Sequence, residues 1–249
     1  MPKIDFSTLQ DNNAFPFGIA VARGAFANLS GIQKFGYNSD IAATEEVIWN
    51  PGGSVIYPTS AATVEIDSTS ADDISTGTGA RSIELQGLDE NYDLVIETVT
   101  LDQTDSAGLH GVSTNTFIRL FRARVATAGS GGVNAGVITC TIGGNTMAQI
   151  PADAGQTLQA IYTVPAGKRA YLLSVHSGTS KEKEITLGLY AKPFGNGFNL
   201  KVYETFRQRL DRKYDIVEFF DEKTDIELRA KADATTQISG GFELLLEDK

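Results

Sequence analysis

Strict alternation of apolar and polar side chains is the feature that most limits the folds open to this sequence. Between residues 225 and 233, an apolar residue at every second position alternates with a charged one, as in Ile226, Glu227 and Leu228. A period of two places the two kinds of side chain on opposite faces of a β-strand, so we expect a buried face and a solvated face that carries Glu227. Residues 241–247 repeat the pattern, and the short link at 234–236 predicts a hairpin between the two segments.

Further segments rich in β-branched and aromatic residues predict strands along most of the chain. Two more hairpins are expected, 81–88 with 94–101 and 156–164 with 169–177; the second surrounds the turn sequence Pro165-Ala166-Gly167-Lys168. Other strands are predicted at 61–66, 115–126, 136–142, 147–150, 185–192 and 199–207. Helical periodicity is weak, and residues 211–222 fit an extended segment as well as a helical turn, so we leave them unassigned. The pattern predicts an all-β protein, an antiparallel β-sandwich of the jelly-roll type with an extended N-terminal arm.

The predicted arm covers residues 1–38 and differs in kind from the rest of the chain. Its aromatic residues Phe6, Phe15, Phe17 and Phe26 are scattered among Gly, Asn and Ala without a clear period. They could be buried on a neighbouring subunit or on the chain's own domain, and the sequence favours neither. After the arm we expect a β-rich region at 39–110 and an antiparallel sandwich at 111–249, which could form one continuous domain.

Charge and composition exclude several classes of protein. The 249 residues include 21 Lys and Arg against 31 Asp and Glu, a net charge of −10 that disfavours binding to nucleic acid or to an anionic membrane surface. The apolar runs are much shorter than the roughly 20 residues that a membrane-spanning helix needs. The first ten residues lack the apolar stretch of a secretory signal. We therefore expect neither nucleic acid nor membrane as a partner.

Residues capable of catalysis are few and poorly placed. His110 and His176 are the two histidines, and neither stands near a Gly-x-Ser-x-Gly motif. The single cysteine, Cys140, alternates with β-branched residues like a small buried apolar side chain. The acidic residues are too numerous, and too often on polar strand faces, to single out a glycosidase pair. The sequence predicts no enzyme activity and no cofactor.

A Ser/Thr-rich loop carries three acidic residues, Asp67, Asp72 and Asp73. Carboxylates of this kind can bind calcium, but their spacing does not match the known calcium loop. A turn stabilised by hydrogen bonds from Ser and Thr side chains explains the same residues, so we expect no metal site.

Trp49 and an arginine cluster are the remaining candidates for contact residues. Arg119, Arg122 and Arg124 stand out against the acidic background, and guanidinium groups suit bidentate pairing with carboxylates at a domain or subunit interface better than a dedicated anion site. Trp49 is the only tryptophan, and we expect it in the core or as an interface anchor in preference to a sugar-stacking role. The candidate interface residues are Phe6, Phe15, Phe17, Phe26, Trp49, Arg119, Arg122 and Arg124.

Three stretches in the same order along the chain resemble a group of tailed-bacteriophage virion structural proteins found in aquatic phages. They are KFGYNSDI at 34–41 with EEVIWNPGG at 45–53 and Tyr57-Pro58, GTGARSIELQGLD at 77–89 with ETVTL at 97–101, and YTVPAGK at 162–168. The resemblance implies a β-rich protein of the capsid or tail, commonly a symmetric oligomer, that is made in the host cytoplasm and resides in the virion. It implies no catalytic residues.

These observations lead us to expect an outer capsid cement or decoration protein, a homotrimer that contacts the major capsid protein. One alternative is a tail or fibre-associated protein that binds the host. Another is a carbohydrate-binding β-sandwich module with a surface glycan as partner, in which Trp49, Tyr57 and Tyr92 would stack on sugar rings.

Overall fold

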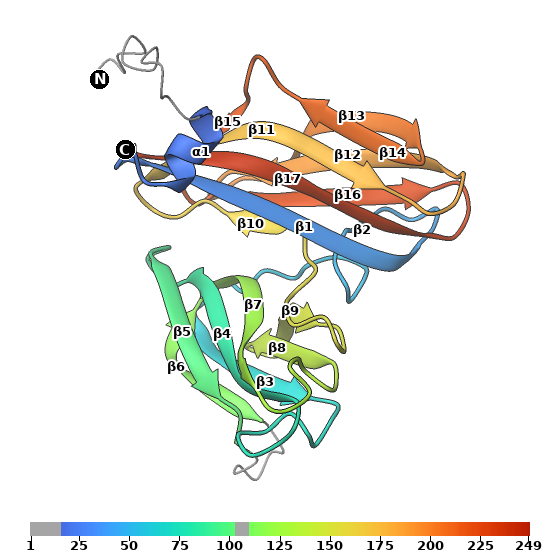
Figure 1. The fold of residues 1–249 in the computed structure, drawn as a ribbon. Coiled ribbons are helices and arrows are strands. Elements are labelled where there is room, and N and C mark those ends of the chain that lie inside the picture. The colour runs from blue at the N-terminus through green and yellow to red at the C-terminus, as the bar shows by residue number, and fades with distance from the viewer. Residues whose placement is uncertain (1–15, 103–109) are drawn as a thin grey trace.

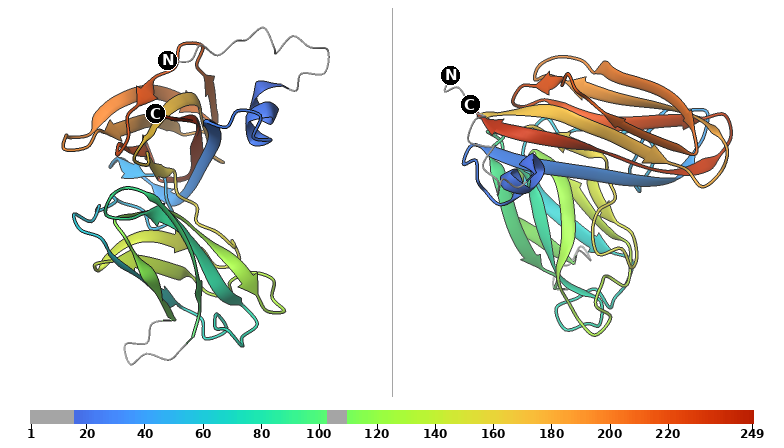
Figure 2. Two further views of the ribbon diagram at one scale, coloured as in Figure 1. Left: turned by 90° about the vertical axis from the view of Figure 1, so that its left-hand side faces the viewer. Right: turned by 45° about the horizontal axis from the view of Figure 1, so that its top comes forward.

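The computed structural model describes residues 16–102 and 110–249, which form two β-sandwiches built from antiparallel sheets (Figure 1). Strands β3 to β9 form one sandwich, here called the inserted sandwich, between β2 and β10 of the other. The second, here called the terminal sandwich, contains β1, β2 and β10 to β17. Figure 2 shows the inserted sandwich beneath the terminal one. The all-β antiparallel sandwich predicted from alternation is confirmed.

Two five-stranded sheets make up the terminal sandwich. The first contains β1 (Leu29–Ile41), β17 (Thr236–Asp248), β11 (Lys168–Gly178), β14 (Arg209–Lys213) and β15 (Phe219–Phe220). The second contains β10 (Ile161–Thr163), β16 (Asp225–Ala232), β12 (Glu184–Lys192), β13 (Asn199–Arg207) and β2 (Glu46–Val47). One short helix, α1 (Phe17–Ala22), precedes β1.

The strand order of the terminal sandwich is that of a jelly roll. Its eight main strands follow the chain as β1, β10, β11, β12, β13, β14, β16 and β17. The first pairs with the last, the second with the seventh, the third with the sixth and the fourth with the fifth. A long hairpin folded over on itself gives this order, with sheets β1-β17-β11-β14 and β10-β16-β12-β13. The jelly-roll form predicted from the sequence is therefore present.

The inserted sandwich contains two smaller sheets. One has the order β6-β3-β8-β9, with bounds Gly111–Phe117, Ala62–Ser68, Ile138–Ile142 and Asn145–Ile150. The other has the order β5-β4-β7, with bounds Leu94–Thr100, Ala80–Leu88 and Arg119–Ala128. β4 and β5 form the hairpin predicted at 81–101.

Each sandwich has its own apolar core between its sheets. Val64, Ile66, Phe117 and Cys140 belong to the core of the inserted sandwich. The core of the terminal sandwich includes Leu187 and Phe242 and also extends to residues of the inserted sandwich, among them Leu88, Tyr92, Ile118 and Phe121. The two sandwiches therefore share a packed junction.

The predicted domain boundaries do not separate the two sandwiches. The segment predicted to be an extended arm contains α1 and most of β1, which pairs along its length with β17. The boundary at residue 110 cuts the inserted sandwich, because β6 pairs with β3. Aromatic residues without a period do not reveal that residues 29–41 are the first strand of a jelly roll.

Two predicted hairpins are wrong, because the two strands of each do not pair with one another. β16 and β17 lie in different sheets, as do β10 and β11, although the strands themselves form where alternation places them. The turn at 165–168 is present, with Gly167 at φ 70° and a hydrogen bond from Lys168 N to Pro165 O, but it connects the two sheets. Alternation identifies a buried face without identifying the sheet to which the strand belongs.

Candidate functional site

A buried ion pair joins the two sandwiches. Arg119, the first residue of β7, donates from Nε and Nη2 to the two carboxylate oxygens of Asp225 on β16, at 2.7 and 3.0 Å. Both side chains are buried, and Asp225 also accepts a hydrogen bond from Thr163. Arg119 Nη1 donates to the carbonyls of Pro58 and Ile118. Burial lowers the pKa of Arg119, but the hydrogen bond to Asp225 and the charge of Asp225, together with smaller effects of Tyr92 and Tyr57, outweigh it, and the pKa lies above its ordinary value.

A second buried acid, Glu227, lies two residues along β16. Its Oε2 accepts a hydrogen bond from Arg229 Nε at 2.6 Å, and it is 1% exposed. Desolvation raises the pKa of Glu227, and Arg229 opposes the shift only in part. The prediction that Glu227 lies on a solvated face is wrong. The rule of alternation assumes that the outer face of the strand meets water, whereas here that face is covered at the junction.

Aromatic rings surround the Arg119 guanidinium. Its central carbon lies 4.7 Å from the ring centroid of Tyr57 and 5.5 Å from that of Tyr92. Burial, and then the charge of Glu227, raises the pKa of Tyr57 well above its usual range. Above these residues a pocket of about 540 Å³ opens between the sandwiches, with Lys192, Phe194 and Lys223 in its lining.

A buried lysine also lies at the junction. Lys34 on β1 is 3% exposed and donates from Nζ to the carbonyl of Phe121 on β7. Burial, and then the charge of Arg122, lowers the pKa of Lys34 well below its usual range. Sequence reasoning missed this residue, because nothing in the pattern of residues 29–41 shows that Lys34 shares the inward face of the sheet with Phe242, its partner in register on β17.

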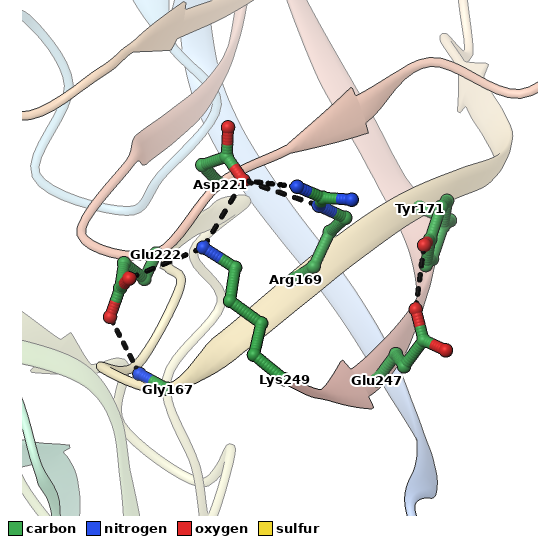
Figure 3. Close-up of polar contacts among 7 residues, drawn as sticks. All are labelled: Gly167, Arg169, Tyr171, Asp221, Glu222, Glu247 and Lys249. Carbon is green, nitrogen blue, oxygen red and sulfur yellow. Dashed lines mark hydrogen bonds and ion pairs between the residues drawn. The ribbon is translucent and has the colours of Figure 1, made fainter. Parts of the chain in front are cut away.

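One end of the terminal sandwich gathers charged residues around the end of the chain, as Figure 3 shows. Lys249 Nζ lies 3.2 Å from Asp221 Oδ1 and 3.2 Å from Glu222 Oε1. Arg169 also pairs with Asp221, at 2.9 Å, and the backbone N–H of Gly167 donates to Glu222. These contacts hold the end of β17 against the turns that precede β11 and β16.

Exposed apolar side chains lie at this same end. The register places Leu29 opposite Glu247, Glu247 opposite Arg169, and Ala170 opposite Phe220, so the start of β1 and β15 are at one end of the sheet. α1 leads into β1 there, near the end of the chain (Figure 1). The exposed fractions are 41% for Phe17, 47% for Ile19 and 51% for Phe219. We call these three residues the terminal apolar patch.

The predicted interface residues fall into different environments. Phe6 and Phe15 lie outside the described residues. Phe17 is exposed and Phe26 half-buried, with their ring centroids 5.6 Å apart. Trp49 is 3% exposed, packs with Val47 and Ile161, and donates from Nε1 to the carbonyl of Gly52.

Two arginines of the cluster pair with acids within the chain, and the third donates to a backbone carbonyl. Arg119 binds Asp225 as described, Arg124 makes a bidentate pair with Glu84 at 2.8 Å for both bonds, and Arg122 donates to the carbonyl of Gln33. Arg119 thus pairs with an acid at the junction between the sandwiches, whereas Arg124 pairs with one inside the inserted sandwich.

The acidic loop is organised by Asp73, which is buried. Its two oxygens accept hydrogen bonds from Ser68 Oγ and from the backbone N–H groups of Ala80, Ala135 and Gly136. Burial raises the pKa of Asp73, but these four bonds outweigh it and the pKa lies below its ordinary value. In residues 16–102 and 110–249, no group of three His, Cys, Asp or Glu side chains is arranged to hold a metal ion.

The two histidines and the cysteine, considered above for catalysis, lie in the following surroundings. His110 is buried, with Nδ1 3.1 Å from Asp67 Oδ1 and 3.1 Å from the backbone N of Ser68. Cys140 is fully buried, and burial raises the pKa of its thiol to about 12. His176 lies on β11, as predicted. Within the described part of the chain no helix is long and apolar enough to span a membrane.

No family model matches this sequence, and no curated protein matches it. Among solved structures, a chain from T=1 particles derived from infectious bursal virus is 9% identical at a TM-score of 0.20, over 88% of this chain and 69% of the other. A chain of the infectious bursal disease virus Gt strain is 8% identical at a TM-score of 0.20, over 88% and 72%. Both are chains of viral particles, and a TM-score this low does not establish a common fold.

Proposed function

We propose that this chain is a non-enzymatic virion structural protein, an outer capsid cement or decoration protein that stabilises the head through contacts with the major capsid protein and with other copies of itself. Two observations support the proposal besides the resemblance of residues 34–58, 77–101 and 162–168 to tailed-phage virion proteins. The terminal sandwich is a jelly roll, a fold that viral capsid domains share with lectins and other proteins. That likeness is an analogy at the level of fold, so the proposal depends on the second observation.

The terminal apolar patch is the observation that carries the proposal. Phe17 and Ile19 expose apolar area where α1 leads into β1, and Phe219 exposes its side chain on β15, which pairs with β11 at the same end of that sheet. Fully burying an apolar side chain of this size contributes about 1.5–3 kcal/mol, so several such contacts in each oligomer would hold the protein on a shell. Apolar side chains gathered on a surface and bordered by charged residues commonly mark an interaction site.

The segment before β1 can be deleted without removing a described strand. All strands in residues 16–102 and 110–249 begin at Leu29 or later, and the carbonyl of Asn28 accepts a hydrogen bond from Asp248 N at 2.9 Å. A variant that lacks residues 1–26 keeps this bond and every strand. We expect it to fold, with an unchanged far-ultraviolet circular dichroism spectrum, and to lose cosedimentation with phage particles that lack this protein.

A double substitution separates the patch from the rest of the deleted segment. Phe17→Ser with Ile19→Ser should also abolish cosedimentation. The matched control, Leu94→Ser with Ile96→Ser, removes side chains that are 52% and 57% exposed on β5 of the inserted sandwich. Cosedimentation of the truncated or patch variant at the level of the unaltered protein, or its loss in the control alone, would refute the role of the patch.

The location is tested on phage particles, and the oligomeric state is tested on the purified protein. Immunogold electron microscopy with an antibody to the native chain should label heads, and light scattering should give a mass three times that of one chain. Label confined to tails would replace the cement role with a tail or fibre-associated role in host binding. Intact particles without label would refute a surface virion role.

A further inference from the structure

The pocket between the two sandwiches has a chemistry that a structural role does not require. Its volume of about 540 Å³ is in the range of small-molecule sites. We propose that this pocket binds an acidic saccharide, with the carboxylate of the sugar between the ammonium groups of Lys192 and Lys223 and one face of a sugar ring on Phe194.

Unpaired positive charge is the first reason. In the part of the chain that the structure describes, neither Lys192 nor Lys223 takes part in an ion pair, whereas Arg119 at the floor is matched by Asp225. The remaining acid of the lining, Glu90, is exposed. The pocket therefore carries a local excess of positive charge on a chain with a net charge of −10, which favours an anionic ligand.

Aromatic rings beside these cations are the second reason. Phe194 is 63% exposed, and its ring lies edge-on to Tyr92 with centroids 5.7 Å apart and planes at 85°. Lys223 Nζ lies 5.3 Å from the centroid of Tyr92 and 5.5 Å from that of Phe194. An acidic sugar presents both a carboxylate and an apolar ring face, and Thr59 and Asn196 in the lining provide polar groups for its hydroxyls.

Backbone conformation is the third reason. Tyr92 and Lys223 both have positive φ, at 69° and 62°, which is uncommon for residues other than glycine. These two residues come from different sandwiches, one from the turn after β4 and the other from the turn before β16, and both line the pocket. Costly backbone conformations that present neighbouring side chains to one pocket are typical of ligand sites.

The shape of the lining favours a saccharide over an acidic peptide. Most of the lining consists of turns and loops, among them residues 193–196 between β12 and β13. Strands contribute only terminal residues, Arg119 of β7, Lys192 of β12 and Asp225 of β16, so the described lining offers no length of strand edge for an extended peptide. The Arg119 side chain, fixed by four hydrogen bonds, gives the pocket a rigid floor. A rigid, concave site of this volume suits one or two sugar rings.

The test uses the full chain and digalacturonate, with an uncharged digalactoside for comparison, in isothermal titration calorimetry and saturation-transfer NMR. Digalacturonate should bind, and the digalactoside should bind about tenfold more weakly because it lacks charge-assisted bonds. Lys192→Met and Lys223→Met should each weaken digalacturonate binding about tenfold. Phe194→Ala should weaken the binding of both ligands. Lys181→Met, an exposed lysine outside the pocket, is the matched control and should change nothing.

Three outcomes would overturn the proposal. One is the absence of saturation transfer from the protein to digalacturonate and to two further acidic sugars, glucuronate and N-acetylneuraminate. Another is binding that the double variant Lys192→Met, Lys223→Met leaves unchanged while circular dichroism shows it folded. The third is binding of an aspartate-rich peptide that these substitutions abolish, with no saccharide bound. Because the terminal apolar patch is untouched, the pocket variants should still cosediment with particles, so this result is independent of the structural role.

Discussion

Replacing Arg119 with methionine would test whether the buried ion pair holds the two sandwiches together. The substitution keeps the unbranched side chain and removes the guanidinium, so Asp225 loses two charge-assisted hydrogen bonds. Asp225 is 2% exposed and would keep only the bond from Thr163. The carbonyl of Pro58 would lose the Arg119 donor as well.

The expected cost is large for a single substitution. Removing one partner of a buried pair leaves an uncompensated buried charge and costs about 3–5 kcal/mol, against a total stability of about 5–15 kcal/mol. Arg124→Met on the same strand is a matched control, because Arg124 also makes a bidentate carboxylate pair, with Glu84, but its side chain is 53% exposed. An exposed pair of this kind contributes about 0–1 kcal/mol.

Urea unfolding followed by fluorescence and circular dichroism would measure the difference. Trp49 is the single tryptophan and is buried in the terminal sandwich beside Ile161, so its emission reports unfolding there. The double variant Arg119→Met, Asp225→Leu removes both charges and should recover most of the loss, because well-packed apolar replacements of buried pairs are often neutral. Equal costs for Arg119→Met and Arg124→Met, or no recovery in the double variant, would refute the reasoning.

Three further predictions concern buried polar groups. Because the pKa of Lys34 is lowered in the native state, stability falls as pH drops below about 10.4, and Lys34→Met should abolish this dependence in denaturant titrations from pH 7 to 10. Because the pKa of Glu227 is raised, stability falls as pH rises above about 4.3, and the difference in unfolding free energy between the unaltered protein and Glu227→Gln should show this slope. Asp73→Asn replaces one carboxylate oxygen with an NH₂ group, so the donors to that oxygen lose their acceptor, and the change should cost about 1–3 kcal/mol in urea unfolding, whereas EDTA should leave the melting temperature of the unaltered protein unchanged.

Local pattern was enough to predict most of the strands and the class of fold. The alternation at 226–232 and the turn residues at 89–93 report on neighbouring residues, and β16 and the β4–β5 hairpin form there. The partners of strands were harder to predict, because a jelly roll pairs its first strand with its last. β1 and β17 are nearly two hundred residues apart in sequence and have no local signal that links them.

The candidate site was only partly predictable for a related reason. Tyr57 and Tyr92 were identified as candidate sugar-stacking residues, and both line the junction pocket, whereas Trp49 is buried elsewhere. Lys192 is the last residue of the predicted strand at 185–192, and Phe194 belongs to the turn that follows it. What makes them part of a site is the approach of the inserted sandwich, which no local pattern reports.

The position of Arg119 shows how a single irregularity decides the architecture. By simple alternation, Arg122 and Arg124 share one face of β7 and Arg119 lies on the other, in the core of the inserted sandwich. The register with β4 shifts, however, so that Gln86 is opposite Arg122 and Gly87 is opposite Leu120, which leaves Phe121 as an extra residue. This bulge returns Arg119 to the outward face and directs it to Asp225, while Phe121 packs against Tyr162 of the terminal sandwich with ring centroids 4.8 Å apart. A side chain added at Gly87 would lie 2.1 Å from the carbonyl oxygen of Arg119, so the bulge also needs a glycine opposite it. The junction between the sandwiches thus depends on one inserted residue and one missing side chain, and an alternation count over the same ten residues would have placed its central arginine on the wrong face.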